Sequence, residues 1–288
     1  MKQQSFNLIF FLICMVSLSC YAKSEEVYID DIVYNIDTEN RQATVARQNP
    51  YGLAPNVKTA LIPENIVWNE VTYPVVALDE MAFYNCPNLT KVAIPNSVVS
   101  IGEEAFRYCK ALVEVILPKN LTALSKGMFD GCESLETIDL PTAITVIPEF
   151  CFQNCKSLKS IVIPEGVTTI GSQAFWYTYA LASITIPSSL KKLDGTLSGA
   201  GWPLVPTIHI SDMNSFCNII CSGDLCGNNC WYLQLNGEEV TEVIIPDGTK
   251  DISIWKRCES LESITTPTSV ESCDFYSSNP VSYTHLTL

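Results

Sequence analysis

The sequence predicts a repeat solenoid that is mainly β with short helical turns. From Asn88 to Trp202 the chain divides into five near-copies of 23 residues. A fixed period in this range is typical of solenoids. The composition, 47% hydrophobic and 17% charged, favours a folded chain over a disordered one. A proline closes a short aliphatic run at the same place in every copy: Pro95, Pro118, Pro141, Pro164 and Pro187.

Each copy contains a short strand and an aromatic turn. It opens with Leu-x-x-Ile-x-Ile-Pro, as in Leu158 to Pro164, and this alternation predicts a half-buried strand. Proline has no N–H for a strand ladder, so it ends the strand. An aromatic residue then stands three places before a cysteine, as in Phe106 and Cys109. One copy buries too little apolar surface to fold alone, so we expect the copies to stack.

This layout of strand, proline, second strand and Ala-Phe-x-x-Cys resembles the BspA-type leucine-rich repeats of bacterial surface proteins, over roughly Val27 to Pro280. The departures are Thr178 in place of a cysteine and Leu197–Gly199 in place of Ala-Phe. The resemblance implies a leucine-rich-repeat-like right-handed superhelix with a β N-terminal cap. It also implies a non-catalytic adhesin-like protein at the cell surface, binding host matrix proteins such as fibronectin and fibrinogen.

The N-terminus predicts export. Lys2, an apolar run from Phe6 to Val16 and small residues before Ala22 form the pattern of a signal peptide over residues 1–22. The apolar run is too short for a transmembrane span. Two routes stay open: cleavage after Ala22, giving a secreted or surface-displayed chain, or a lipid anchor at Cys20.

Residues 23–87 are predicted to form a β-rich N-terminal cap and a first partial repeat. Apolar and polar residues alternate on both sides of a polar turn near Asp37–Asn40, which predicts a hairpin. The first Ile-Pro pair is Ile62–Pro63, and the first Ala-Phe-x-x-Cys begins at Ala82. Terminal units of a solenoid are atypical because one face has no neighbour.

Behind the five regular repeats of residues 88–202, the period breaks. Residues 203–238 form an irregular cysteine-rich variant repeat, with a predicted strand at Thr207–Ile210 and a short helix capped by Ser211 or Asp212. Asn236–Gly237 predicts a tight hairpin. Residues 239–280 contain two further repeats. The last eight residues, 281–288, match no repeat and resemble a sequencing adapter when back-translated. We expect them to be non-native and the natural gene to continue beyond about Pro280.

The charge excludes two classes of partner. A net charge of −14, from 17 basic and 31 acidic residues, argues against nucleic acids and anionic membranes. It permits cationic partners, although an acidic surface also serves solubility alone. The expected partners are extracellular proteins.

The thirteen cysteines fall into groups. Four recur at the repeat period, where they are either disulfide-capable neighbours or small buried apolar groups: Cys86, Cys109, Cys132 and Cys155. Four more cluster in the variant repeat: Cys217, Cys221, Cys226 and Cys230. In an exported protein this cluster favours a disulfide, with free packed thiols or zinc as alternatives. No resident metal or cofactor is expected.

Catalytic signatures are scarce. Of two histidines, His285 lies in the unusual tail and His209 lies in a predicted strand, which is typical of a structural residue. No nucleophile elbow, zinc-protease motif or phosphate loop occurs. The sequence therefore predicts a protein that is not an enzyme.

The candidate binding residues face outward from the predicted strands. Several aliphatic residues among them suggest a protein-binding strip, because solenoids bind through extended faces. β-branched residues are also good strand formers, which is the simpler reading. The alternative function is a structural spacer or self-associating array that displays a missing downstream domain. The two columns are Ala93, Ile116, Asp139, Val162, Thr185, Ile244 and Thr265, and Lys91, Glu114, Thr137, Ser160, Ser183, Glu242 and Ser263.

Overall fold

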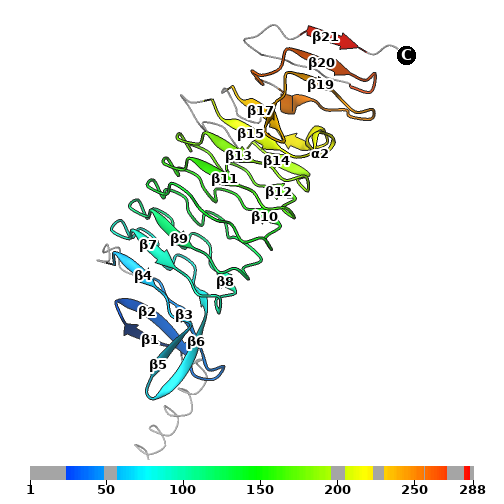
Figure 1. Cartoon of the computed structure of the whole chain (residues 1–288). Helices are drawn as coiled ribbons and strands as arrows, with labels where there is room; N and C mark the ends of the chain where they lie inside the picture. The colour runs from blue at the N-terminus through cyan, green and yellow to red at the C-terminus, as the bar shows by residue number, and fades with distance from the viewer. Residues whose placement is uncertain are drawn as a thin grey trace, which may run out of the picture.

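The computed structural model describes residues 24–48, 57–195, 205–222, 230–255, 257–270 and 282–285 (Figure 1). The predicted signal peptide and Cys226 lie outside them. The chain winds into an elongated β solenoid whose rungs stack from an N-terminal cap toward the C-terminal strands. Among the described residues, helix is confined to α2 (Met213–Cys217) and the 3-10 helix η2 (Ser253–Trp255). The repeat turns are therefore not helical.

The cap comprises five strands of a six-stranded sheet, and tight turns join β1 to β2, β2 to β3 and β5 to β6. The hairpin expected near Asp37–Asn40 is present, and the Asp37 carboxylate accepts the backbone N–H groups of Glu39 and Asn40 at 3.0 and 2.9 Å. Two more hairpins turn at Asp30–Asp31 and Asn69–Glu70, where both residues have positive φ. Asp and Asn tolerate that backbone region better than most residues. The cap strands are β1 (Ser24–Ile29), β2 (Ile32–Asp37), β3 (Gln42–Val45), β6 (Val71–Leu78) and β5 (Asn65–Trp68), in that order.

The first strand row is the ladder of strands that precede the repeat prolines. Neighbouring strands are parallel and pair position for position, as in Lys91 with Glu114 and Ser160 with Ser183. The rungs from 59 to 235 are β4 (Thr59–Leu61), β7 (Lys91–Ala93), β9 (Glu114–Ile116), residues 137–140, β11 (Ser160–Val162), β13 (Ser183–Thr185), β15 (Thr207–Ile210) and β17 (Tyr232–Leu235).

The second strand row follows the prolines on another side of the solenoid. It starts at β6, so the cap is continuous with the repeats. Its later strands are β8 (Ser100–Ile101), β10 (Val146–Ile147), β12 (Thr169–Ile170), β14 (Lys192–Asp194) and β16 (Ile220–Ser222).

The turn row carries the Ala-Phe-x-x-Cys segments and is held by backbone bonds between copies. Each turn has two residues of positive φ, four positions apart, as at Glu104 and Tyr108. The N–H groups of alternate residues in this segment point toward the next copy. In that copy-to-copy ladder Phe106 N donates to Met128 O at 3.0 Å. Equivalent triplets of bonds join the copies from Met81 to Trp176. The stack is thus hydrogen-bonded along its axis without regular strand or helix.

The core is a column of identical side chains. Five phenylalanine rings stack face to face, with centroids 5.4–5.6 Å apart and interplanar angles of 7–10°. The turn-row cysteines join this column, since the thiol of Cys132 donates to the carbonyl oxygen of Phe106 at 3.2 Å. The rings are those of Phe83, Phe106, Phe129, Phe152 and Phe175.

Close approach of the copies in the second row depends on glycine. Gly171 N donates to Ile147 O at 2.8 Å, and a Cβ on Gly171 would lie 2.7 Å from the backbone nitrogen of Glu149. Ser125 stands at the equivalent position two copies earlier, 46 residues before Gly171. There the hydroxyl, instead of the backbone, donates to Ile101 O at 2.7 Å, and residues 123–124 are not a strand.

The C-terminal part departs from the regular array at a hairpin. Asp212 caps α2 by accepting Asn214 N and Ser215 N, as predicted for this residue. The hairpin at Asn236–Gly237 is also present, and its return strand β18 (Glu238–Glu239) occupies the free edge of β17. The chain then starts a new parallel sheet of β19 (Glu242–Ile244), β20 (Ser263–Thr266) and β21 (Ser282–His285). Part of the segment predicted to be non-native, residues 282–285, thus pairs with β20.

We predict that Gly171→Ala lowers the free energy of unfolding by about 2 kcal/mol, because the added methyl group must push two backbones apart. Urea unfolding followed by circular dichroism measures the change. Ser172→Ala, at the next residue, is the control and should shift stability by less than about 0.5 kcal/mol. Equal stability of the two variants would contradict the close-approach account.

Candidate binding face

The first strand row exposes every second side chain. In β9 and β11 the central residues Val115 and Ile161 are buried, whereas the flanking residues point to solvent. This alternation is intrinsic to a strand with one face on the core. The outward side chains of successive rungs therefore form columns, and none of them is needed to fill the core.

The structure divides the predicted columns among three hydrogen-bonded sheets, and residues 137–140 pair with none of them. Lys91 and Ala93 pair with Glu114 and Ile116, while Ser160 and Val162 pair with Ser183 and Thr185. Glu242 and Ile244 pair instead with Ser263 and Thr265, in the sheet beyond β18. The sequence-based expectation of one continuous column was wrong at two points. Residues 137–140 pair with neither β9 nor β11, and β18 separates β17 from β19.

Sequence reasoning missed six outward positions of the first strand row. Leu61 continues the column before Ala93, and His209 and Gln234 continue it after Thr185. The neighbouring column gains Thr59, Thr207 and Tyr232. The signal for Leu61 was present, since it precedes Ile62–Pro63 as Ala93 precedes Ile94–Pro95. His209 is half-buried within this row.

Large aliphatic side chains stand out on this face. Leu61 is 62% exposed, Ile116 49%, Val162 64% and, on the separate sheet, Ile244 71%. Exposed aliphatic residues that recur on one face indicate a contact surface more than scattered ones do.

One rung of the first row is open. Residues 137–140 pair with neither β9 nor β11, although the turn-row bonds to both neighbouring copies are intact. A hollow lies on each side of this rung. The smaller, about 220 Å³, is bounded by Ile116, Lys119 and Asp139 among others. The larger, about 390 Å³, is bounded by Thr137, Ile138, Asp139, Leu140, Thr142, Ser160, Ile161, Val162 and Pro164.

Ion pairs between copies neutralise most charges near the open rung. Lys91 lies 2.8 Å from Glu114, and Lys159 lies 2.5 Å from Glu136. Asp139 is exposed and forms no ion pair or hydrogen bond with the described residues. It is therefore a free carboxylate between two exposed aliphatic side chains, Ile116 and Val162.

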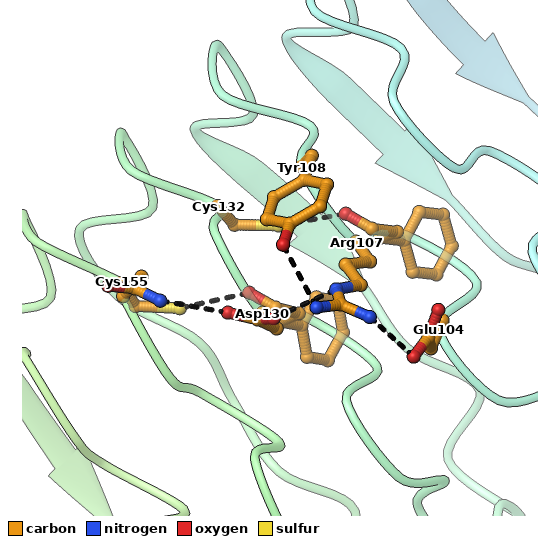
Figure 2. A network of polar contacts seen from close by, with 9 residues as sticks. Glu104, Arg107, Tyr108, Asp130, Cys132 and Cys155 are labelled. Atoms are coloured by element: carbon orange, nitrogen blue, oxygen red, sulfur yellow. Dashed lines mark hydrogen bonds and ion pairs between the residues drawn. The ribbon is translucent and has the colours of Figure 1, made fainter. Parts of the chain in front are cut away.

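The turn row contains a second polar cluster, centred on Arg107 (Figure 2). Its guanidinium lies 2.6 Å from Glu104 and 2.9 Å from Asp130, and donates to the hydroxyl of Tyr108 at 2.9 Å. Asn154 also donates to Asp130 at 3.1 Å, so the cluster links three copies. Burial raises the pKa of Asp130, while Asn154 and Arg107 oppose the rise. Because every member is engaged within the solenoid, the cluster fastens repeats together.

The cysteines are thiols in the structure. The periodic Cys86, Cys109, Cys132 and Cys155 are buried and free. In the variant repeat, Cys217 and Cys221 are buried and free, and Cys230 is free and half-buried. The structure thus contains no disulfide among these three. No group of three or more metal-ligating side chains occurs within the described ranges.

The structure also bears on membrane insertion. Within the part of the chain that it describes, no helix is long and apolar enough to cross a bilayer.

Comparisons with known proteins agree with the repeat architecture. Residues 77–197 match the family model described as BspA type Leucine rich repeat region, in six copies. A comparison with curated proteins found no match. The crystal structure of a T. pallidum leucine-rich repeat protein is similar at 29% identity and a TM-score of 0.54, covering 65% of this chain and 86% of its own. A leucine-rich cell surface protein from Faecalibacterium prausnitzii A2-165 shares the fold at 23% identity and a TM-score of 0.51, covering 85% and 71%.

We predict that Arg107→Met costs about 3 kcal/mol of unfolding free energy, because it leaves a buried carboxylate without its cation. The double variant with Asp130→Asn should recover part of this loss. Because the pKa of Asp130 in the folded state is above its ordinary value, low pH favours the folded state. The difference in unfolding free energy between the single and double variants should therefore shrink as pH falls through the pKa of Asp130.

The measurement for this pair is urea unfolding at several pH values. Lys110→Met is the control, since its pair with Glu133 is exposed and should be worth less than about 1 kcal/mol. A double variant less stable than Arg107→Met would contradict the assigned role.

We predict slow alkylation of the buried thiols. Burial raises the pKa of Cys132 and Cys155, that of Cys217 to about 12 and that of Cys258 to about 11, so little thiolate forms at pH 8. Half-buried Cys230 should react first with iodoacetamide, and the others only in denaturant. Peptide mapping by mass spectrometry measures the order; native labelling of Cys132 as fast as Cys230 would contradict it.

Proposed function

We propose, on the premise that residues 77–197 are BspA-type leucine-rich repeats, that this chain is an exported, non-catalytic protein whose first strand row binds macromolecules outside the cell. The observation that carries the proposal is the set of exposed aliphatic side chains on this row, above all Ile116 and Val162. They contribute to no core in the described chain, and they flank the hollows of the open rung.

Three further features support this assignment. The F. prausnitzii protein of similar fold is a cell surface protein. The N-terminal sequence predicts a signal peptide, and Cys20 offers a lipid anchor as an alternative to free secretion. The acidic composition disfavours nucleic acids and anionic membranes as ligands, which leaves extracellular proteins, including host matrix proteins, as the proposed partners.

A second candidate is a spacer or self-associating array. The observation that favours it is the set of ion pairs between successive copies, such as Lys126 with Glu149 and the two lysines, Lys110 and Lys156, that share Glu133. With the continuous aromatic core they give a stiff rod. If the exposed row joins two copies of the chain, the same aliphatic residues would be covered in a dimer.

We predict that the pair of substitutions Ile116→Lys and Val162→Lys lowers adsorption to immobilised fibrinogen or fibronectin at least tenfold, because each places a charge in an apolar contact. Surface plasmon resonance on the full chain measures binding. The matched control is Val146→Lys with Ile220→Lys, which alters two exposed aliphatic residues of the second strand row.

Binding that is unchanged by the first pair, with an intact circular dichroism spectrum, would reject the first strand row as the site. Light scattering separates the two candidate functions. A dimer that the first pair dissociates, without any matrix binding, would support the self-associating array.

A further inference from the structure

The open rung at residues 137–140 differs in chemistry on its two sides. Toward β9 the smaller hollow is bounded by Lys119 as well as Asp139, and the ammonium group of Lys119 repels cations. Toward β11 the larger hollow is bounded by a single charged residue, Asp139, together with the hydroxyl-bearing residues Thr137, Thr142 and Ser160. Apolar residues complete its wall, including Leu140 and Val162.

The neighbouring charges leave Asp139 available to a ligand. The lysine of the next copy, Lys159, is already held by Glu136 at 2.5 Å, and Lys91 by Glu114. Lys119 borders the smaller hollow with Asp139 but forms no ion pair with it among the described residues. A carboxylate beside apolar walls gains more from a cation than one in open solvent does, because the local dielectric is lower. One carboxylate alone is too few ligands for a metal ion, and the described residues contain no cluster of three or more metal-ligating side chains.

We propose that the larger hollow, between residues 137–142 and 160–164, is a specificity pocket for a basic side chain of a partner protein. The guanidinium or ammonium group pairs with Asp139, the hydroxyl groups of the rim accept its remaining N–H donors, and its methylene stem lies against Leu140 and Val162. Long basic side chains combine an apolar stem with a charged head, which matches a pocket with apolar walls and one carboxylate. This inference rests on the proposed function and adds the chemistry of the ligand.

The open rung also explains why the pocket lies here. At the other rungs between residues 59 and 185, paired backbones bring the outward side chains close together. At residues 137–140 the pairing is absent on both sides while the turn row stays bonded, so the first row can separate without unstacking the copies. Space for a side chain therefore arises without a cavity in the core.

The test uses the full chain and three fluorescein-labelled, acetylated peptides of the sequence Ser-Val-Ser-X-Ser-Val-Ser. The central residue X is arginine, its neutral isostere citrulline, or glutamate. Fluorescence anisotropy should show the arginine peptide binding at least fivefold more tightly than the citrulline peptide, and the glutamate peptide most weakly. Asp139→Asn should remove the difference between arginine and citrulline. Raising the ionic strength should reduce it.

The matched control is Glu103→Gln, which removes an exposed carboxylate of the turn row that borders neither hollow. It should keep the full preference for arginine. Equal binding of arginine and citrulline by the unmodified chain, or a preference that survives Asp139→Asn, would overturn the pocket.

The failure of this inference is distinguishable from that of the proposed function. Matrix adsorption that the two lysine substitutions abolish, in a chain with no preference for arginine, would leave the first strand row as the binding site and reject the pocket. An arginine preference that depends on Asp139, with matrix adsorption unaffected by those substitutions, would keep the pocket and reject matrix proteins as its partners.

Discussion

The stacking of one repeat on the next determines every other property of this molecule. Each of the four copies that contain Phe83, Phe106, Phe129 and Phe152 contributes one phenylalanine ring, one set of aliphatic side chains and three turn-row N–H groups. Each of these needs a partner in the neighbouring copy. A single copy would leave the rings half-exposed and the N–H groups unpaired. Stability is therefore a property of the array, and any residue that sets the distance between copies affects all three interactions together.

The same constraint explains the cysteines and glycines. A small thiol at the end of the aromatic turn can donate to the carbonyl of the preceding copy, as Cys155 does to Phe129 O at 3.2 Å. Where Thr178 replaces the cysteine, its hydroxyl bonds within its own copy, to Phe175 O at 2.8 Å. The glycines of the second row act by having no side chain. Ser125 has a side chain, and its hydroxyl group, instead of its backbone N–H, donates to the carbonyl oxygen of Ile101. Local sequence changes thus alter which atoms connect two copies.

Sequence patterns predicted the structural features that recur in every copy, but not the features that occur at a single place in the chain. The period, the alternation before each proline and the Phe-x-x-Cys spacing led to the stacked fold and the outward columns. The hairpins at Asp30–Asp31 and Asn69–Glu70 were missed because their turn residues lack glycine. The hairpin at Asn236–Gly237 was predicted, but the sequence did not indicate that its return strand β18 would end the first strand row. Its two residues, Glu238 and Glu239, are also compatible with an ordinary hairpin strand. The loss of strand pairing at residues 137–140 depends on the distances between three successive copies. The local sequence, Thr-Ile-Asp-Leu, fits the repeat template, so it predicts an ordinary paired strand.

The separation of the stacking elements from the exposed row has a functional consequence. Because the aromatic column and the turn row hold the copies together, the first strand row is free to vary in side chains and, at one rung, in backbone pairing. A solenoid can therefore acquire a binding pocket by substitutions that leave its core unchanged. Asp139 illustrates this: the equivalent outward positions hold Ile116 and Val162, so a single residue places a carboxylate between two apolar neighbours. Under the proposed function, specificity depends on which residue each copy presents at the outward positions, and on which rung is open.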